Sequence, residues 1–157
     1  MLRSARLIFN PVAGHSDPDF DLEQIRSLLA DVDLEVVQTT PEVGADELAR
    51  QAVEHGVDAV IASGGDGTLS AAANALIGTN IPLGVIARGT ANAFANALGI
   101  PTTIEGACET ILQGQTKIVD AASCNGQPMV LLAGIGFEAE TVNLADHNAK
   151  NRLGMLA

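Results

Sequence analysis

The chain has 157 residues, of which 8 are basic and 19 acidic, so its formal net charge at pH 7 is −11. This charge argues against a nucleic-acid groove, and aromatic residues at 3%, with no Trp and no Tyr, exclude base-stacking platforms. The two cysteines lack CxxC spacing, and no apolar run is as long as a membrane span, which needs about 20 residues. We therefore expect a soluble, cytoplasmic protein.

Short β-branched apolar runs alternate with longer segments rich in Ala and Leu, a pattern typical of βαβ units. In chain order, the pattern predicts strand 6–10, helix 20–30, strand 34–38, helix 45–54, strand 57–63, helix 68–77, strand 82–87, helix 91–98, helix 103–112 and strand 117–122. The expected fold class is therefore α/β, with a three-layer, mostly parallel sheet that carries helices on both faces.

The pattern changes after the last of these strands. Asn125 and Gly126 are the signal of a type I′ hairpin turn, which would join that strand to an antiparallel partner at 129–133. We therefore place one α/β domain at 1–122 and the opening segment of a second, β-rich domain at 123–157. Because no element closes this second unit, we expect the chain to be truncated.

A strand left without its partner would expose an unpaired edge and apolar surface around Val130 to Leu132. We therefore expect the chain to self-associate, in the simplest case as a homodimer.

Three glycine-containing turns directly follow three predicted strands and supply the candidate binding residues. They are Asn10-Pro11-Val12-Ala13-Gly14, Gly64-Gly65-Asp66-Gly67-Thr68 and Gly89-Thr90-Ala91-Asn92. In a parallel sheet all three would emerge at the carboxyl edge, where such folds bind ligands. Glycine lets the backbone approach a ligand closely, and N–H groups that lead into a helix cradle phosphate oxygens. The hydroxyls of Thr68 and Thr90 can add donors at the same rim.

Two simpler readings stand beside this one. A glycine cluster between a strand and a helix is often only a tight turn, and Asn10 with Pro11 can be a strand terminator with a cap. The convergence of three such turns on one edge favours the binding site. The chain contains neither the G-x-x-x-x-G-K-[ST] pattern of P-loop enzymes nor the G-x-S-x-G pattern of serine hydrolases.

Charged residues near these turns leave alternatives open. Asp66 lies inside the second turn, where its carboxylate would repel phosphate unless a cation, naturally Mg²⁺, stood between them. Asp120 lies in a predicted strand, where it is either a paired structural acid or a residue beside the metal. Arg88 either meets an anion or is an exposed charge without a role. The acids of 17–23 indicate a solvated loop and a first helical turn.

The order of these motifs resembles the N-terminal half of the diacylglycerol kinase catalytic domain family, lipid kinases that include the sphingosine kinases. The matching residues are Asn10, Pro11 and Gly14 of N-P-x-x-G, Thr40 followed by Gly44, Gly64 to Thr68 of G-G-D-G-T, Pro82-Leu83-Gly84 leading to Gly89, Thr90, Ala91, Asn92 and Phe94, and then Gly134, Gly136 and Phe137.

The resemblance implies that ATP binds to these residues with Mg²⁺ and that its γ-phosphoryl group passes to a lipid hydroxyl. Asn10 and Thr40 would line the nucleotide cleft, Thr90 would close it, and Asp66 with Asp120 would organise Mg²⁺ through water. The second domain would bind the lipid and carry the general base beyond Ala157, so this chain alone is expected to bind but not to turn over. The full-length protein would contact the membrane surface transiently.

The sequence departs from the family's pattern at Ala71, Ala87, Ala93 and Glu138, and two expected carboxylates are missing. Two other functions stay open. An NAD kinase or a phosphofructokinase-like enzyme shares the G-G-D-G turn, although Asn10, Pro11 and the third turn favour the lipid branch. A non-catalytic nucleotide-binding regulatory module is favoured by Ala71 and Ala93.

Overall fold

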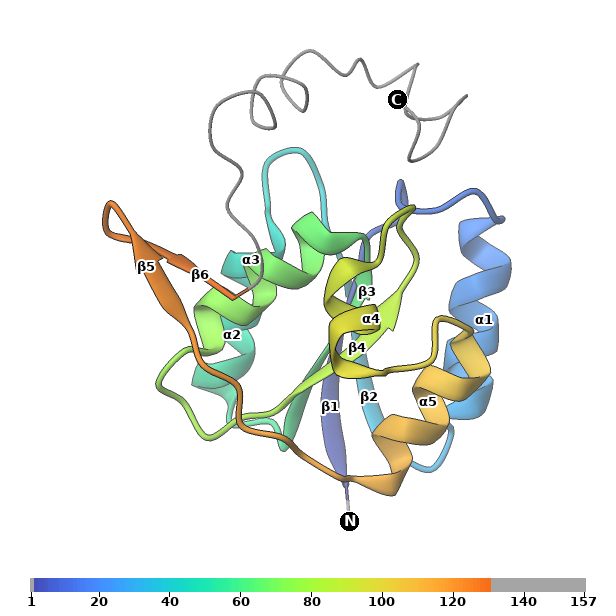
Figure 1. Cartoon of the computed structure of the whole chain (residues 1–157). Helices are drawn as coiled ribbons and strands as arrows, with labels where there is room; N and C mark the ends of the chain where they lie inside the picture. The colour runs from blue at the N-terminus through green and yellow to red at the C-terminus, as the bar shows by residue number, and fades with distance from the viewer. Residues whose placement is uncertain (1, 131–157) are drawn as a thin grey trace.

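Four parallel strands form the central sheet in the computed structural model, which describes residues 2–130 (Figure 1). The strands are β1 (Ser4–Phe9), β2 (Asp33–Gln38), β3 (Ala59–Gly64) and β4 (Leu83–Ala87), in the order β2-β1-β3-β4. All six residues of β3 are buried, as expected for a strand that is covered on both faces of a parallel sheet. The predicted α/β fold class is confirmed.

Helices cover both faces of the sheet (Figure 1). The helices α1 (Pro18–Leu28) and α5 (Ile104–Gln113) pack on one face, where Leu7 and Phe9 of β1 meet Ile25 of α1. The helices α2 (Ala45–His55), α3 (Asp66–Leu76) and α4 (Ala93–Leu98) pack on the other, around Ile8 of the same strand. Alternate side chains of one strand thus enter two separate cores. No helix within residues 2–130 has the length and hydropathy needed to cross a bilayer.

Local capping signals explain where several helices begin and end. The Asp17 carboxylate accepts hydrogen bonds from the amides of Asp19 and Phe20, and Pro18 follows at the first helical position of α1. The helix α2 ends at Gly56, whose φ of 70° places it in the left-handed region that favours glycine. The helix α3 begins at Asp66, two residues earlier than predicted. Gly64 still belongs to β3, so the N-cap Gly65 is the single residue between the strand and the helix.

The prediction for the last part of the α/β unit is partly wrong. Residues 115–121 are irregular rather than a strand, and the Ile118 side chain is 98% exposed. The strand β5 (Ala122–Cys124) begins only there, and it pairs with β6 (Gln127–Met129) in a small antiparallel sheet that is separate from the main one. β-Branched residues form a strand only where a neighbouring strand can accept their hydrogen bonds, and this stretch runs over the surface without one.

The turn between β5 and β6 has the predicted geometry. Asn125 and Gly126 have φ values of 51° and 78°, which is the positive pair that a type I′ turn requires. Val130, expected to be exposed, is instead half-buried against the core beside α3. Residues 131–157, which include Leu132 and the Gly134-Ile135-Gly136-Phe137 motif, lie outside the described part. The homodimer and the domain boundary at 122 stay predictions.

The loops that follow β3 and β4 touch through two glycines. A Cβ atom built on Gly89 would lie 2.7 Å from the Gly65 Cα, which is backbone and has no flexible end to move aside. Neither glycine has a positive φ, so the requirement at this contact is space rather than an unusual backbone conformation.

We therefore expect Gly89→Ala to lower the free energy of unfolding by about 1–3 kcal/mol, the usual range for an overpacked contact. Gly67→Ala is the matched control, because a Cβ on Gly67 meets no atom within 4 Å and alanine is the better helix former. Urea unfolding followed by circular dichroism measures both variants. Equal stability of Gly89→Ala and the unsubstituted protein would contradict the close packing of these loops.

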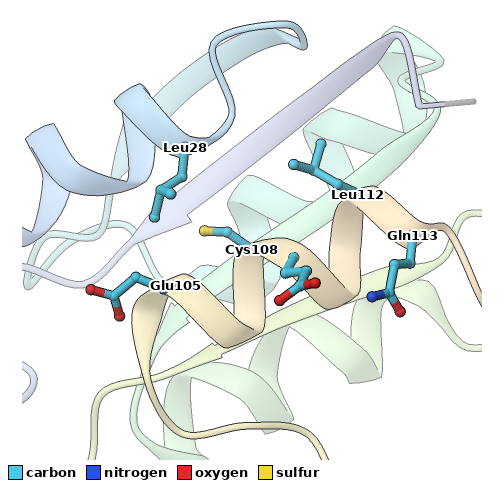
Figure 2. Close-up of a pocket in the computed structure, with 6 residues that line it drawn as sticks. Leu28, Glu105, Cys108, Leu112 and Gln113 are labelled. Atoms are coloured by element: carbon cyan, nitrogen blue, oxygen red, sulfur yellow. The ribbon is translucent and has the colours of Figure 1, made fainter.

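The two cysteines differ in exposure. Cys108 of α5 is fully buried and points toward α1 beside Leu28 (Figure 2), and burial raises the pKa of its thiol to about 11. Because only the thiolate reacts, roughly one Cys108 in a thousand is reactive at pH 8, whereas Cys124 is exposed. We expect a thiol reagent to label one cysteine rapidly in the native protein and the second only after unfolding. Rapid labelling of the Cys124→Ser variant would contradict this.

Candidate functional site

The turns after β1, β3 and β4 meet at the carboxyl edge of the sheet. The Asn10 amide donates to the Ser63 carbonyl (2.9 Å), and the Arg88 amide donates to the Gly64 carbonyl (2.8 Å). The strand β2 lies on one side of β1 and β3 on the other, so chain direction across the sheet reverses between β1 and β3. Ligands of open α/β sheets bind at such a switch point, outside the carboxyl ends of the strands.

The side chain of Asn10 connects the first turn to the second. Its Nδ2 donates to the Thr68 hydroxyl (2.9 Å), and its Oδ1 accepts from the Val12 amide (3.1 Å). Two residues separated by 58 positions in the chain are thereby brought into direct contact. Asn10 therefore caps the end of β1 locally, as one alternative expected, and its side-chain amide also joins the first turn to the second.

The N-terminus of α3 faces this edge with free amides. Its N-cap is Gly65, which has no side chain to accept a hydrogen bond, and the amides of Asp66, Gly67 and Thr68 have no acceptor within residues 2–130. A helix N-terminus carries a partial positive charge of about half an elementary charge, and exposed amides there bind anions. This part of the site suits a phosphate or another oxyanion.

Asp66 has a structural contact in addition to its place in the turn. Its Oδ1 accepts from the Phe94 amide (3.0 Å), which links the first turn of α3 to the first turn of α4. One carboxylate oxygen is therefore engaged, while the other has no hydrogen-bond donor among the described residues. Mg²⁺ is commonly held by one or two carboxylates together with water and substrate phosphates, and a single half-free carboxylate beside an anion cradle fits that donor set.

The third turn is built on an unusual backbone conformation. Asn92 has a φ of 49°, and its Oδ1 accepts from the Gly89 amide (2.8 Å), which closes the turn ahead of α4. Thr90 is exposed at the outside of this turn. The first turn has its own special position at Gly14, where φ is 88° and a Cβ would lie 2.8 Å from the Arg88 carbonyl oxygen. Pro11, in the same first turn, is half-buried.

Thr40 lies at the same edge but in a separate contact group. It follows β2, which is next to β1, and its hydroxyl accepts from the amides of Glu42 (3.2 Å) and Val43 (3.1 Å). The hydroxyl therefore stabilises its own turn, as an ST-turn does. Within the part of the chain that the structure describes, no hydrogen bond joins Thr40 to Asn10, Thr68 or Thr90.

Asp120 is not placed as predicted. It is exposed in the irregular stretch before β5, so the strand expected for it is wrong. No hydrogen bond or ion pair links it to Asp66, and residues 2–130 contain no group of three or more His, Cys, Asp or Glu side chains positioned to hold a metal. Its role beside a metal stays a prediction, and the candidate cation position rests on Asp66.

The structure excludes one of the two alternatives for Arg88 and contradicts the solvated position expected for Asp21. Arg88 is not an exposed charge: its side chain is 3% exposed and forms a salt bridge of 2.8 Å with Asp21, whose side chain is 6% exposed. Asp21 was expected in a solvated helical turn. A signal was present, because Asp21 stands four residues before Ile25 and eight before Leu29, both buried, and so shares their side of α1.

Two hollows in the described part of the chain can be compared with the position of the three turns. The smaller, about 260 Å³, lies at the loop edge and is lined by Gly14, His15, Ser16, Arg88, Asn92 and Thr102 among others. The larger, about 440 Å³, lies between α1 and α5 and is lined by Leu28, Cys108 and Leu112 (Figure 2). The larger hollow has mainly apolar walls and shares no residue with the three turns. The smaller hollow includes residues of the first and third turns, so the candidate site lies beside it.

The electrostatics of the site depend on backbone amides. The three turns themselves contain no Lys or Arg, and the charge of Arg88 is neutralised by Asp21. Among the described residues of this chain, whose net charge is −11, the feature of this edge that attracts an anion is the N-terminus of α3, to which a bound cation would add.

Comparisons with known proteins agree with this geometry. Residues 4–124 match the family model of the diacylglycerol kinase catalytic domain. The chain is 34% identical over 161 residues to a diacylglycerol kinase from Bacillus subtilis, covering 99% of this chain and 53% of that protein. It is 36% identical over 140 residues to a diacylglycerol kinase from Staphylococcus aureus, covering 87% and 44%. An uncharacterised protein from Synechocystis is 49% identical over 167 residues, covering 99% and 39%.

A solved structure shows the same fold. The crystal structure of a diacylglycerol kinase from Bacillus anthracis superposes with a TM-score of 0.73 at 35% identity, over 81% of this chain and 45% of that one. The chain thus spans about half or less of the length of these relatives. The family match over 121 of 157 residues (4 to 124), together with the three converging turns, leads to one conclusion: the chain belongs to the diacylglycerol kinase catalytic domain family.

Proposed function

We propose that this chain is the ATP-binding part of an ATP-dependent lipid kinase that transfers the γ-phosphoryl group of ATP to a lipid hydroxyl. The observation that carries the proposal is the uncapped N-terminus of α3, where the amides of Asp66, Gly67 and Thr68 face the edge at which the three turns converge. Family membership supports the reaction class, and the anion-binding character of the helix end supports the nucleotide.

Each turn has a proposed task. Backbone donors around Gly65 and Gly67, with the Thr68 hydroxyl, hold the phosphates. Asn10 and Thr40 line the nucleotide cleft, and Thr90 closes it. The remaining residues shape the cradle by giving the backbone its turns and close contacts: Pro11, Gly14, Gly64, Gly89 and Asn92.

Mg²⁺ is the proposed cation, held by Asp66 through water and by the phosphates of the nucleotide. When bound, it neutralises charge between the carboxylate and the phosphate oxygens and polarises the transferred group. The chain's own contribution is to orient Asp66, whose contact with the Phe94 amide fixes the carboxylate at the mouth of the cradle.

Phosphoryl transfer also needs an acceptor hydroxyl oriented in line and a base to receive its proton. We place the general base and the lipid-binding surface outside the described residues, in the portion of the relatives that this chain does not span. Residues 123–157 would open that lipid-binding domain, and the complete protein would contact the membrane surface where its lipid lies. On this proposal the chain alone binds nucleotide without turnover.

A non-catalytic nucleotide-binding module is the second candidate. Ala93 is the first residue of α4, next to the Phe94 amide that bonds to Asp66. The resemblance to the family implies a carboxylate at this position. A kinase assay of the full-length protein with γ-labelled ATP separates the candidates. We expect label in a dispersed diacylglycerol or related lipid and none in NAD or a sugar phosphate. Label in NAD would move the protein to the NAD kinase branch, and label in no acceptor would favour the module.

Asp66 provides the sharpest test of the nucleotide site. Asp66→Asn keeps a carbonyl oxygen that can accept from the Phe94 amide but removes the charge, whereas Asp66→Ala removes both. We expect calorimetry to show that Asp66→Asn lowers the affinity for Mg-ATP by at least about tenfold, equivalent to about 1.4 kcal/mol, with little change in stability. ATP without Mg²⁺ is the control. Unchanged Mg-ATP affinity of Asp66→Asn would remove Asp66 from the proposed cation site.

A further inference from the structure

The guanidinium of Arg88 joins three segments that are distant in sequence. Its Nε donates to the Asp21 carboxylate of α1 (2.8 Å), and its Nη1 donates to the Asn10 carbonyl (3.0 Å). Its carbon Cζ lies 4.3 Å from the centre of the Phe9 ring at the end of β1. A planar guanidinium can meet a carboxylate in one direction and a carbonyl in another at the same time, which a lysine ammonium on its flexible stem does not reproduce.

The main chain of Arg88 touches the same turns. Its amide donates to the Gly64 carbonyl, just before the phosphate cradle, and its carbonyl oxygen occupies the space where a Cβ of Gly14 would lie. Arg88 thus contacts the first turn through both its side chain and its backbone. The backbone position of Asn10 is set from one side by Ser63 and from the other by Arg88.

Stability alone accounts poorly for this buried pair. Removing two charges from water costs more than many such pairs return, and an apolar pair of similar volume often does as well or better. The guanidinium of Arg88 also leaves one donor unused, because its Nη2 is buried without a hydrogen-bond partner among the described residues. The Ser63 hydroxyl on the neighbouring strand is likewise buried without a partner. What the charged pair provides and an apolar pair cannot is a directed hydrogen bond to the Asn10 carbonyl.

We propose that Arg88, held in place by Asp21, is a positioning residue that sets the orientation of Asn10 toward Thr68 and the phosphate cradle. The proposal rests on the proposed nucleotide site and adds to it residues that act through Asn10. The Asp21 carboxylate is itself held by the Ser16 hydroxyl, so the chain of contacts runs from the start of α1 through Arg88 to Asn10.

The test replaces the buried pair by an apolar one. Arg88→Met combined with Asp21→Leu leaves no unpaired buried charge, so we expect the protein to stay folded while its Mg-ATP affinity falls by roughly tenfold or more, the loss expected for one charge-assisted hydrogen bond. The control is Arg6→Met with Glu35→Gln, which removes the salt bridge between another buried arginine, Arg6, and the half-exposed Glu35. Neither residue bonds to the three turns. We expect the control to bind as the unsubstituted protein does. Retained affinity in the Arg88 and Asp21 variant would overturn the proposal.

A double-mutant cycle shows whether the effect passes through Asn10. Asn10→Ala removes the side chain that bonds Thr68 but keeps the carbonyl that bonds Arg88. We expect the variant that combines the apolar pair with Asn10→Ala to lose no more Mg-ATP affinity than Asn10→Ala alone, because both changes remove the same contact of the Asn10 side chain. Additive losses would mean that Arg88 acts elsewhere and would overturn the proposal.

An NMR readout separates this inference from the proposed function. The side-chain amide signals of Asn10 report its bond to Thr68 without any nucleotide present. We expect them to shift and to exchange faster in the Arg88 and Asp21 variant and not in the Arg6 control. If the unsubstituted protein does not bind Mg-ATP, the proposed function fails, and these signals still decide whether Arg88 positions Asn10. Unchanged signals would overturn the positioning role.

Discussion

The alignment of three parallel strand ends is the constraint on which the rest of the site depends. Phe9, Ser63 and Ile86 are paired across β1, β3 and β4, so the chain leaves all three strands at nearly the same level. The following turns are then close enough for Asn10 to reach Thr68 and for Gly89 to lie against Gly65. Two apolar cores hold the strands in this register, and slippage by one residue would exchange the buried faces.

The proposed binding of a nucleotide does not depend on a cluster of basic side chains. The uncapped end of α3 presents amides whose orientation is set by the helix itself, and Arg88 beside the turns is already neutralised by Asp21. Fixed dipoles of this kind need little reorganisation when the ligand arrives. This explains how an acidic protein could hold a polyphosphate, provided that a cation separates the phosphates from Asp66.

The described residues suit only one of the two substrates of the proposed reaction. The α/β unit carries the features suited to the nucleotide, whereas nothing in residues 2–130 forms an evident lipid pocket joined to the three turns; the apolar hollow lies between α1 and α5. The relatives are about twice as long as this chain or more. A reaction between a water-soluble nucleotide and a lipid alcohol is well served by two units with different surfaces, one of which meets the membrane.

Periodicity, turn chemistry and motif order were enough to predict the α/β class, the order of the first nine elements, the hairpin turn at Asn125-Gly126 and the meeting of three turns at one edge. These features depend on local preferences and on the geometry that every parallel sheet shares.

Pairing between distant charges is different, because it depends on which side chains the completed packing brings together. The burial of Arg88 against Asp21, the contact of Asp66 with the Phe94 amide, and the exposure of Asp120 where no strand could pair were all decided by the tertiary structure. A charged residue looks the same in a sequence whether it faces water or a partner 67 residues away, and only the folded arrangement of the helices determines which.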